Sequence, residues 1–251
     1  MPDQQPSLKD QVVMITGAAQ RVGAEIARTL HAQGANILIH YRSSLEAAKA
    51  LQQELLEQRK DSAHLVQADL GRPDHLDKLA GEAVEKWQRL DALVNNASTF
   101  YPTPVGSISM QQWDELLDSN LKGPLFLCQK LIPPLRKQHG CIVNIVDIHA
   151  ERPLKNHSVY CIAKAGLAML TKSLARELGP DIRVNAVAPG AILWPQPEPD
   201  QATKTRILSK TLLKRQGNPG DIGKAVLYFI RDAAYVTGQI LAVDGGRLIR
   251  N

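Results

Sequence analysis

The segment Thr16-Gly17-Ala18-Ala19-Gln20-Arg21-Val22-Gly23 is the most informative part of the sequence for the fold. It follows a short apolar run, Val12–Ile15, and leads into a helix-period segment, Val22–Gln33. Gly17 permits a tight turn, and Gly23 allows the helix to pack closely. A helix N-terminus placed after such a turn offers backbone N–H groups and the positive end of a dipole to a pyrophosphate. The position of the turn between a strand and a helix therefore predicts a dinucleotide-binding unit.

Apolar strand-like runs alternate with helix-period segments along the rest of the chain. Strands joined by right-handed helical crossovers form a parallel, doubly wound sheet. We predict one α/β domain of Rossmann type over residues 1–251, with a seven-stranded parallel sheet and helices on both faces. The expected strands are Val12–Ile15, Asn36–His40, His64–Gln67, Ala92–Asn95, Cys141–Val146, Ile182–Ala188 and Gln239–Val243. The expected helices are Val22–Gln33, Ser44–Arg59, Pro73–Trp87, Gln111–Leu135, His157–Leu178 and Pro219–Ile230.

One segment looks inserted, because Trp194-Pro195-Gln196-Pro197-Glu198-Pro199 places three prolines in five positions. Such a segment is extended and semi-rigid. It follows the sixth strand, at the carboxyl edge where doubly wound folds bind ligands. We predict a substrate loop at about residues 191–215, with Leu193 among the substrate-binding residues. A passive connection is the alternative.

Composition limits the class of protein. The chain has 251 residues, of which 44% are hydrophobic and 22% charged, so it can form a substantial core and disorder is not expected. No apolar run approaches the ~20 residues of a membrane span, and the start lacks a signal-peptide pattern. We therefore expect a soluble, cytoplasmic protein. Three scattered cysteines and seven ungrouped histidines predict neither a disulfide framework nor a metal site.

The net charge of +5 could reflect nucleic acid or an anionic small molecule. Lysines and arginines are dispersed among acidic residues, without a basic run, so we expect no nucleic-acid partner. A phosphate-bearing cofactor explains the charge better.

The second strand ends in His40-Tyr41-Arg42-Ser43-Ser44, without the acidic residue that usually binds the ribose of NAD. An arginine and two hydroxyls suit a 2′-phosphate, so we predict NADPH as the cofactor. A solvated loop is the alternative for Arg42, and helix capping ahead of Pro73 is an alternative for Asp69. The predicted cofactor-binding residues are Gly17, Arg21, Val22, His40, Tyr41, Arg42, Ser43, Asp69, Leu70, Asn96, Ala97, Ser98, Tyr160, Lys164, Pro189 and Gly190.

Tyr160 and Lys164 are four residues apart and so share one face of a helix. A lysine ammonium beside a phenol favours the tyrosinate, so we expect the pKa of Tyr160 to be lowered and the phenol to act as a proton donor. Asp147 lies thirteen residues upstream. A carboxylate beside an acid catalyst suits a substrate that carries a proton or N–H donors. A strand-end carboxylate with a backbone bond is the alternative.

These elements together resemble the short-chain dehydrogenase/reductase family over essentially the whole chain. The resemblance rests on the Thr16–Gly23 turn, Asn95-Asn96-Ala97, Asn120, Tyr160-x-x-x-Lys164, Pro189-Gly190 and Asp244-Gly245-Gly246. It implies a Rossmann fold, a catalytic set of Asn120, Tyr160 and Lys164, and a homotetramer. Asp147 stands where that family usually has a serine, and we add it to the catalytic set.

Within the family, the chain is similar to the pteridine reductases through Arg21, His40-Tyr41-Arg42-Ser43, residues 96–104 and Asp147. This likeness implies NADPH-dependent reduction of pterins or dihydropterins, with dihydrofolate as a further candidate, and a stacking role for Phe100. The substrate-binding residues predicted in this way are Arg21, Ser98, Phe100, Asp147, Tyr160 and Leu193.

Two other functions stay open. One is another short-chain carbonyl reductase, such as a 3-oxoacyl-thioester reductase. The other is a non-catalytic NADPH-binding regulator. The basic, apolar tail Arg247–Arg250 could reach a neighbouring subunit's site or could fray.

Overall fold

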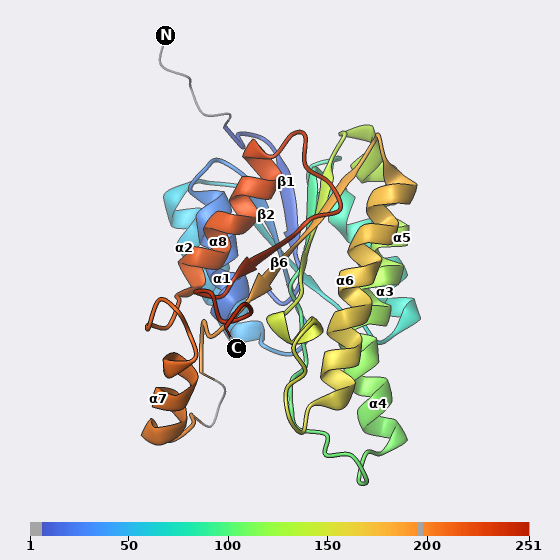
Figure 1. Ribbon diagram of the computed structural model, residues 1–251. Coiled ribbons are helices and arrows are strands. Elements are labelled where there is room, and N and C mark those ends of the chain that lie inside the picture. Colours follow the sequence, from blue (N-terminus) through green and yellow to red (C-terminus); the bar gives the residue numbers. More distant parts are fainter. Residues whose placement is uncertain (1–6, 195–197, 251) are drawn as a thin grey trace.

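Seven parallel strands form the centre of the computed structural model, which describes residues 7–194 and 198–250 (Figure 1). The strand order is β3-β2-β1-β4-β5-β6-β7, so the sheet runs outward from β1 in both directions. The strands are β1 (Val12–Ile15), β2 (Asn36–Tyr41), β3 (Ala63–Gln67), β4 (Ala92–Asn95), β5 (Cys141–Ile145), β6 (Arg183–Pro189) and β7 (Ile240–Val243). β1, β4 and β5 are buried at every position because helices cover both faces of the sheet.

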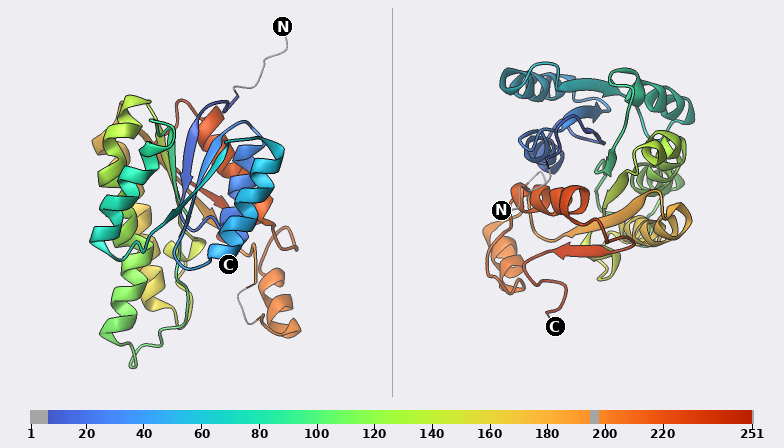
Figure 2. Two further views of the ribbon diagram at one scale, coloured as in Figure 1. Left: turned by 180° about the vertical axis from the view of Figure 1, so that it is seen from behind. Right: turned by 90° about the horizontal axis from the view of Figure 1, so that it is seen from above.

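Helices cover the sheet on both sides (Figure 2). One buried cluster joins α1, α2 and α8 to one face, and a second joins α3, α5 and α6 to the other. The helices are α1 (Arg21–His31), α2 (Leu45–Gln58), α3 (Pro73–Glu85), α4 (Met110–Leu117), α5 (Gly123–Lys137), α6 (Ser158–Leu178), α7 (Gln201–Ser209) and α8 (Pro219–Leu227). Among the described residues, none of these helices combines the length and apolar character needed to cross a membrane.

The predicted seven-stranded parallel sheet with helices on both faces is confirmed, and the observed strand ends lie within one residue of those predicted. The register pairs Val13 with Ile37 on one side and with Ala92 on the other. Parallel pairing of every strand brings all their carboxyl ends to one edge of the sheet. The loops that leave this edge carry the polar residues of the candidate site.

The predicted single helix Gln111–Leu135 is wrong in one respect, because a π-helical turn at Asp118–Lys122 separates α4 from α5. Asn120 explains the change. Its side-chain amide donates to the Leu116 carbonyl at 3.0 Å, and the Gly123 N–H bonds instead to the Asp118 carbonyl, five residues back. The predicted helix Pro219–Ile230 likewise passes into a π-helical turn, Tyr228–Asp232.

The predicted loop at residues 191–215 contains a helix that the sequence pattern did not reveal. α7 begins after Asp200, whose carboxylate accepts from the Thr203 N–H at 2.6 Å. No residue of α7 is buried, so the helix has no apolar stripe from which to predict it. The prolines Pro195 and Pro197 lie outside the described residues.

Candidate active site

A cavity of about 620 Å³ opens at the carboxyl edge of the sheet, between the glycine turn and α6. Every predicted cofactor-binding and substrate-binding residue lines it. These residues are Gly17, Arg21, Val22, His40, Tyr41, Arg42, Ser43, Asp69, Leu70, Asn96, Ala97, Ser98, Phe100, Asp147, Tyr160, Lys164, Pro189, Gly190 and Leu193. Asn120 is the one predicted site residue that does not line the cavity.

The glycine turn fits a dinucleotide phosphate. Gly17 has φ +61°, and a Cβ there would lie 2.9 Å from the Ala97 Cα. A Cβ at Gly23 would lie 2.3 Å from the Gly17 carbonyl oxygen, so both positions require glycine. Within the described residues no side chain caps the first turn of α1, and that turn contains no acidic residue. The uncapped N–H groups and the helix dipole therefore remain available to an anion.

His40 stabilises the glycine turn through a hydrogen bond to its backbone. It is buried, its Nδ1 accepts from the Gly17 N–H at 3.1 Å, and its Nε2 donates to the Ala68 carbonyl at 3.1 Å. Burial lowers the pKa of His40 to about 4, so the ring is neutral at pH 7. Arg42 and Ser43 are exposed beyond it, and among the described residues no carboxylate lies within ion-pair distance of Arg42.

Asp69 occupies the predicted cavity wall, but it does not cap α3. Its carboxylate accepts from the Gly71 N–H at 3.0 Å, and no side chain caps α3 at Arg72. The capping alternative for Asp69 is therefore wrong.

Asn96 and Asn120 position the loop after β4. The Asn96 side chain donates to the carbonyls of Thr16 and Gly17 at 2.8 and 3.0 Å, which ties this loop to the glycine turn. Ser98 donates from its hydroxyl to the Asn120 Oδ1 at 2.7 Å, and the Asn120 amide donates to the Thr99 carbonyl at 2.9 Å. Asn120 is completely buried, so it acts on the cavity through the backbone and Ser98.

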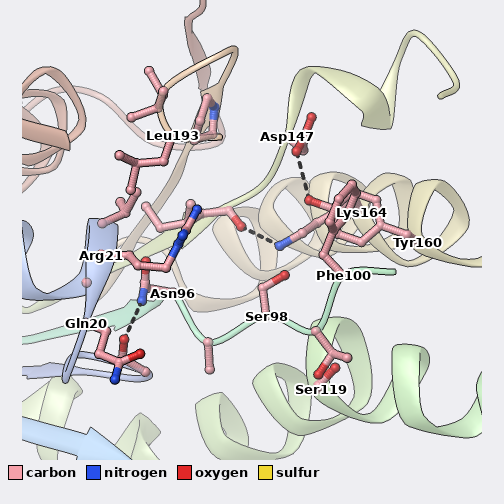
Figure 3. A pocket seen from close by; sticks show the side chains of 18 of the residues that line it. Gln20, Arg21, Asn96, Ser98, Phe100, Ser119, Asp147, Tyr160, Lys164 and Leu193 are labelled. Atoms are coloured by element: carbon pink, nitrogen blue, oxygen red, sulfur yellow. Dashed lines mark hydrogen bonds between the residues drawn. The ribbon is translucent and has the colours of Figure 1, made fainter. Parts of the chain in front are cut away.

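Tyr160 and Lys164 extend from α6 toward the cavity, with Asp147 opposite the phenol (Figure 3). The Tyr160 hydroxyl donates to the Asp147 Oδ2 at 2.8 Å, and the Asp147 Oδ1 accepts from the His149 N–H at 2.8 Å. The Lys164 ammonium donates to the Ile145 carbonyl at 2.9 Å and lies 5.7 Å from the centre of the Tyr160 ring. Asp147, Tyr160 and Lys164 therefore lie together at one end of the cavity, as predicted.

The predicted lowering of the pKa of Tyr160 is wrong. Burial raises the pKa of Tyr160 well above 10, and the charge and hydrogen bond of Asp147 raise it further. Burial also lowers the pKa of Lys164 to about 8, partly offset by Asp147. The residue pair alone suggested an activated phenol because spacing does not reveal that the phenol donates to a carboxylate.

Phe100 and Arg21 both have partners inside the chain. The Phe100 ring stacks on His157, with centroids 4.6 Å apart and planes at 13°, and meets Tyr160 edge-on at 4.8 Å. Arg21 has φ +55°, in the left-handed region that glycine tolerates best, and its guanidinium donates to the Trp194 carbonyl at 2.9 Å. Arg21 thereby connects the glycine turn to the segment that leads into α7.

Several cavity residues escaped prediction, and Arg247 matters most. His149, Leu154 and Ile207 line the cavity from loops and from α7, without any sequence pattern that would mark them. Arg247 also lines the cavity, three residues after Asp244. Within its own chain the tail is folded against the cavity through Arg247, so this part of it does not fray; contact with a neighbouring subunit stays a prediction. The proximity of Arg247 to the family motif at Asp244 was the available signal.

Comparisons with known proteins agree with this architecture. A family model described as "Enoyl-(Acyl carrier protein) reductase" matches residues 17–247. The chain is 35% identical to 3beta-hydroxysteroid dehydrogenase 1 of Eggerthella lenta, over 95% of this chain and 94% of that protein. It is 34% identical to the 3-oxoacyl-[acyl-carrier-protein] reductase FabG of Staphylococcus epidermidis, over 93% and 97% of the two chains. It is also 34% identical to the 3-oxoacyl-[acyl-carrier-protein] reductase of Synechocystis sp., over 97% and 99%.

The prediction of a pterin or folate reductase is wrong, because these relatives are named for 3-oxoacyl and hydroxysteroid substrates. The structure supplies the physical reason. Phe100, Arg21 and Asp147 suggested a stacked, nitrogen-rich ring, yet each has a partner within the chain: His157, the Trp194 carbonyl and Tyr160. These residue types therefore do not by themselves specify a pterin.

The match of the family model spans most of the chain, and the parallel sheet, the glycine turn and the Tyr160–Lys164 pair lie within it. The chain belongs to the short-chain dehydrogenase/reductase family of NAD(P)H-dependent oxidoreductases.

Proposed function

We propose that this chain is an NADPH-dependent 3-oxoacyl-thioester reductase, which converts a 3-oxo group to a 3-hydroxyl group. The observation that carries the proposal is the Tyr160 phenol beside Lys164 in the 620 Å³ cavity. The 34% identity to two reductases named for 3-oxoacyl substrates, each over more than nine-tenths of this chain, supports that substrate class.

NADPH would be held by the glycine turn and the end of β2. The N–H groups at the start of α1 would bind its pyrophosphate, and Arg42 with Ser43 would suit its 2′-phosphate. A ribose 2′-hydroxyl would instead favour an acidic residue after β2, which this chain lacks. NADPH supplies the hydride that reduces the carbonyl carbon.

Tyr160 supplies the proton. As the carbonyl carbon is reduced, its oxygen gains negative charge and takes the phenolic proton of Tyr160. The Lys164 ammonium then stabilises the tyrosinate that remains. Burial lowers the pKa of Lys164 only to about 8, so most of this side chain stays charged at pH 7.

Asp147 controls how readily Tyr160 releases its proton. The Asp147 carboxylate accepts a hydrogen bond from the Tyr160 hydroxyl at 2.8 Å and so competes with the substrate oxygen for this donor. In its protonated form, Asp147 can donate to the substrate oxygen and can return a proton to the tyrosinate. Ser98 and the buried Asn120 position the loop that faces them.

The test is a substrate panel with the purified chain, in which oxidation of NADPH is followed by its absorbance. The panel contains S-acetoacetyl-N-acetylcysteamine, a 3-oxosteroid and a dihydropterin, with Tyr160→Phe as the matched control. We expect turnover of the thioester that Tyr160→Phe abolishes. Turnover of only the steroid or only the dihydropterin would contradict the proposed substrate, and cofactor binding without any turnover would indicate a regulator.

We also propose that the chain forms a homotetramer through α5 and α6. These helices expose large apolar side chains, Phe126, Ile162 and Met169, with 41%, 49% and 61% of their surface accessible. A second copy of the chain would bury them. Light scattering on the purified protein should give four times the mass of one chain, and replacement of Phe126 and Met169 by glutamate should lower it. A monomeric wild-type chain would contradict the proposal.

A further inference from the structure

The segment after β7, residues 244–250, folds back against the active-site cavity, and Arg247 lines that cavity. We call this segment the C-terminal strap. Gly245 and Gly246 have φ +64° and +80°, which turn the chain sharply after Asp244. The Asp244 carboxylate accepts from the Gly246 N–H at 2.8 Å and from the Leu248 N–H at 2.6 Å. The C-terminal segment lies at the same end of the sheet as α7 (Figure 1). This turn sets the position of Arg247, which lies between the two bonded amides.

A second set of contacts holds the strap in place. Arg152 donates from Nη1 to the carbonyls of Arg247 and Leu248 at 3.0 and 3.1 Å, and also to the Arg250 carbonyl. Leu248 packs against a small buried cluster that includes Val146 and Ile148, next to Asp147. The tail is therefore tied at its backbone and at one apolar side chain, while Arg247 is directed to the cavity.

The guanidinium of Arg247 has donors that the described residues do not use. No hydrogen bond or ion pair of its side chain occurs among residues 7–194 and 198–250. The carboxylates of Asp147 and Asp244 act electrostatically on the Arg247 guanidinium, but both already accept hydrogen bonds from other groups. Asp147 accepts from the Tyr160 hydroxyl and the His149 N–H. Asp244 accepts from two backbone N–H groups. Burial of the guanidinium lowers the pKa of Arg247, against the opposing effect of these carboxylates.

We propose that Arg247 is a specificity-determining residue that binds a second oxygen of the substrate, close to the carbonyl that is reduced. A guanidinium binds carbonyl and carboxylate oxygens through directed N–H donors. Leu248, next to Arg247 in sequence, packs against Val146 and Ile148, which flank Asp147, and Asp147 contacts Tyr160. Arg247 therefore lines the cavity at the end where the carbonyl is reduced and not at the glycine turn. The inference rests on the proposed function and narrows it to substrates with a second oxygen acceptor: the thioester carbonyl of a 3-oxoacyl thioester, or a carboxylate in its place.

Three substrates separate these cases. S-acetoacetyl-N-acetylcysteamine offers a thioester carbonyl, acetoacetate offers a carboxylate, and 2-octanone offers no second oxygen. The variants are Arg247→Met, which keeps the apolar stem, and Arg247→Lys, which keeps the charge but loses the fork of donors. Arg176→Met is the matched control, because Arg176 is exposed on α6 and does not line the cavity. Thermal melting of each variant checks that the strap still folds.

For Arg247→Met we expect kcat/KM on the thioester to fall about 10- to 100-fold, the range for loss of a hydrogen bond to a charged group. The loss should appear mainly in KM, because the contact forms in the ground state as well as in the transition state. Activity on 2-octanone should not change, and Arg247→Lys should recover part of the loss. A larger loss on acetoacetate than on the thioester would identify the carboxylate as the natural acceptor within the proposed class.

An equal loss on the thioester and on 2-octanone would overturn the inference, because Arg247 would then act on the Tyr160 site and not on a second oxygen. Unchanged KM on both 3-oxo substrates would overturn it as well. In either case the wild-type chain would still reduce the thioester, and the proposed function would stand. Failure of the wild-type chain to reduce the thioester would overturn the proposed function, and the inference with it.

Discussion

Replacement of Lys164 by methionine measures how much the buried ammonium of Lys164 lowers the free energy of unfolding. Lys164 has 2% of its surface exposed, and burial lowers its pKa from 10.5 to about 8. At ~1.36 kcal/mol per pH unit, this difference corresponds to about 3 kcal/mol of destabilisation while the side chain is charged. Methionine has a similar length and no charge, so Lys164→Met removes that cost.

The substitution also removes the hydrogen bond to the Ile145 carbonyl, which stabilises the fold by about 1 kcal/mol in either protonation state. At pH 7 the variant should therefore be about 2 kcal/mol more stable than the wild-type chain. Because the folded-state pKa is the lower one, the unfolded chain binds more protons between pH 8 and 10.5, and wild-type stability rises over this window relative to the variant. Above pH 10.5 the variant should be about 1 kcal/mol less stable than the wild-type chain.

Urea unfolding of the cofactor-free protein at pH 7 and at pH 10.5 gives these free energies. Lys172→Met is the control, because Lys172 is exposed on the same helix and should change stability little at either pH. A Lys164→Met protein that is less stable than wild type at pH 7, or a difference that does not depend on pH, would show that the buried charge of Lys164 does not destabilise the fold.

Three further substitutions test the site. Tyr160→Phe removes the proton donor, so turnover should be lost while NADPH affinity, measured by fluorescence titration, stays near wild type; retained turnover would place the donor elsewhere. Asp147→Ser removes a charge that raises the pKa of Tyr160, so thioester reduction should persist with the alkaline limb of the pH–kcat profile at lower pH; an unmoved limb would contradict this. Arg42→Ala should reduce the preference for NADPH over NADH about 10- to 100-fold in kcat/KM, and an unchanged ratio would exclude contact with a 2′-phosphate.

The sheet and the cavity edge were predictable because they follow from local patterns. Continuous apolar runs such as Val12–Ile15 are typical of strands covered on both faces, and the glycine turn fixes where the first helix begins. Parallel pairing then carries loop residues to the carboxyl edge whatever the details of packing. For this reason residues as distant in sequence as Gly17, Ser98 and Gly190 were correctly expected around one cavity.

The remaining features depend on contacts that a sequence pattern does not encode. The pKa of Tyr160 depends on which group its hydroxyl meets, and the spacing to Lys164 does not show that this group is Asp147. α7 has no buried residue, so it lacks an apolar stripe. Arg247 reaches the cavity through two glycine turns and the contacts of Arg152, which no local pattern predicts.

The identity of the substrate is even harder to predict from individual residues. From the sequence alone, Arg21 in the glycine turn and Phe100 in its loop indicate contact with a ligand, because a sequence does not show partners within the chain. The carbonyl of Trp194 and the ring of His157 provide partners within the chain. Relatives aligned over nearly the whole chain therefore carry more weight for the substrate than these individual residues do.

Hydride transfer to the 3-carbon of an acyl thioester is the claim on which the proposed function depends, and isotope labelling tests this step. The purified chain is incubated with S-acetoacetyl-N-acetylcysteamine and NADPH carrying deuterium at the transferable position, and the product is analysed by mass spectrometry. We predict a 3-hydroxyacyl thioester with one deuterium on the 3-carbon, formed by the wild-type chain and not by Tyr160→Phe. Recovery of unreduced thioester from the wild-type reaction, under conditions where NADPH binds, would contradict the claim.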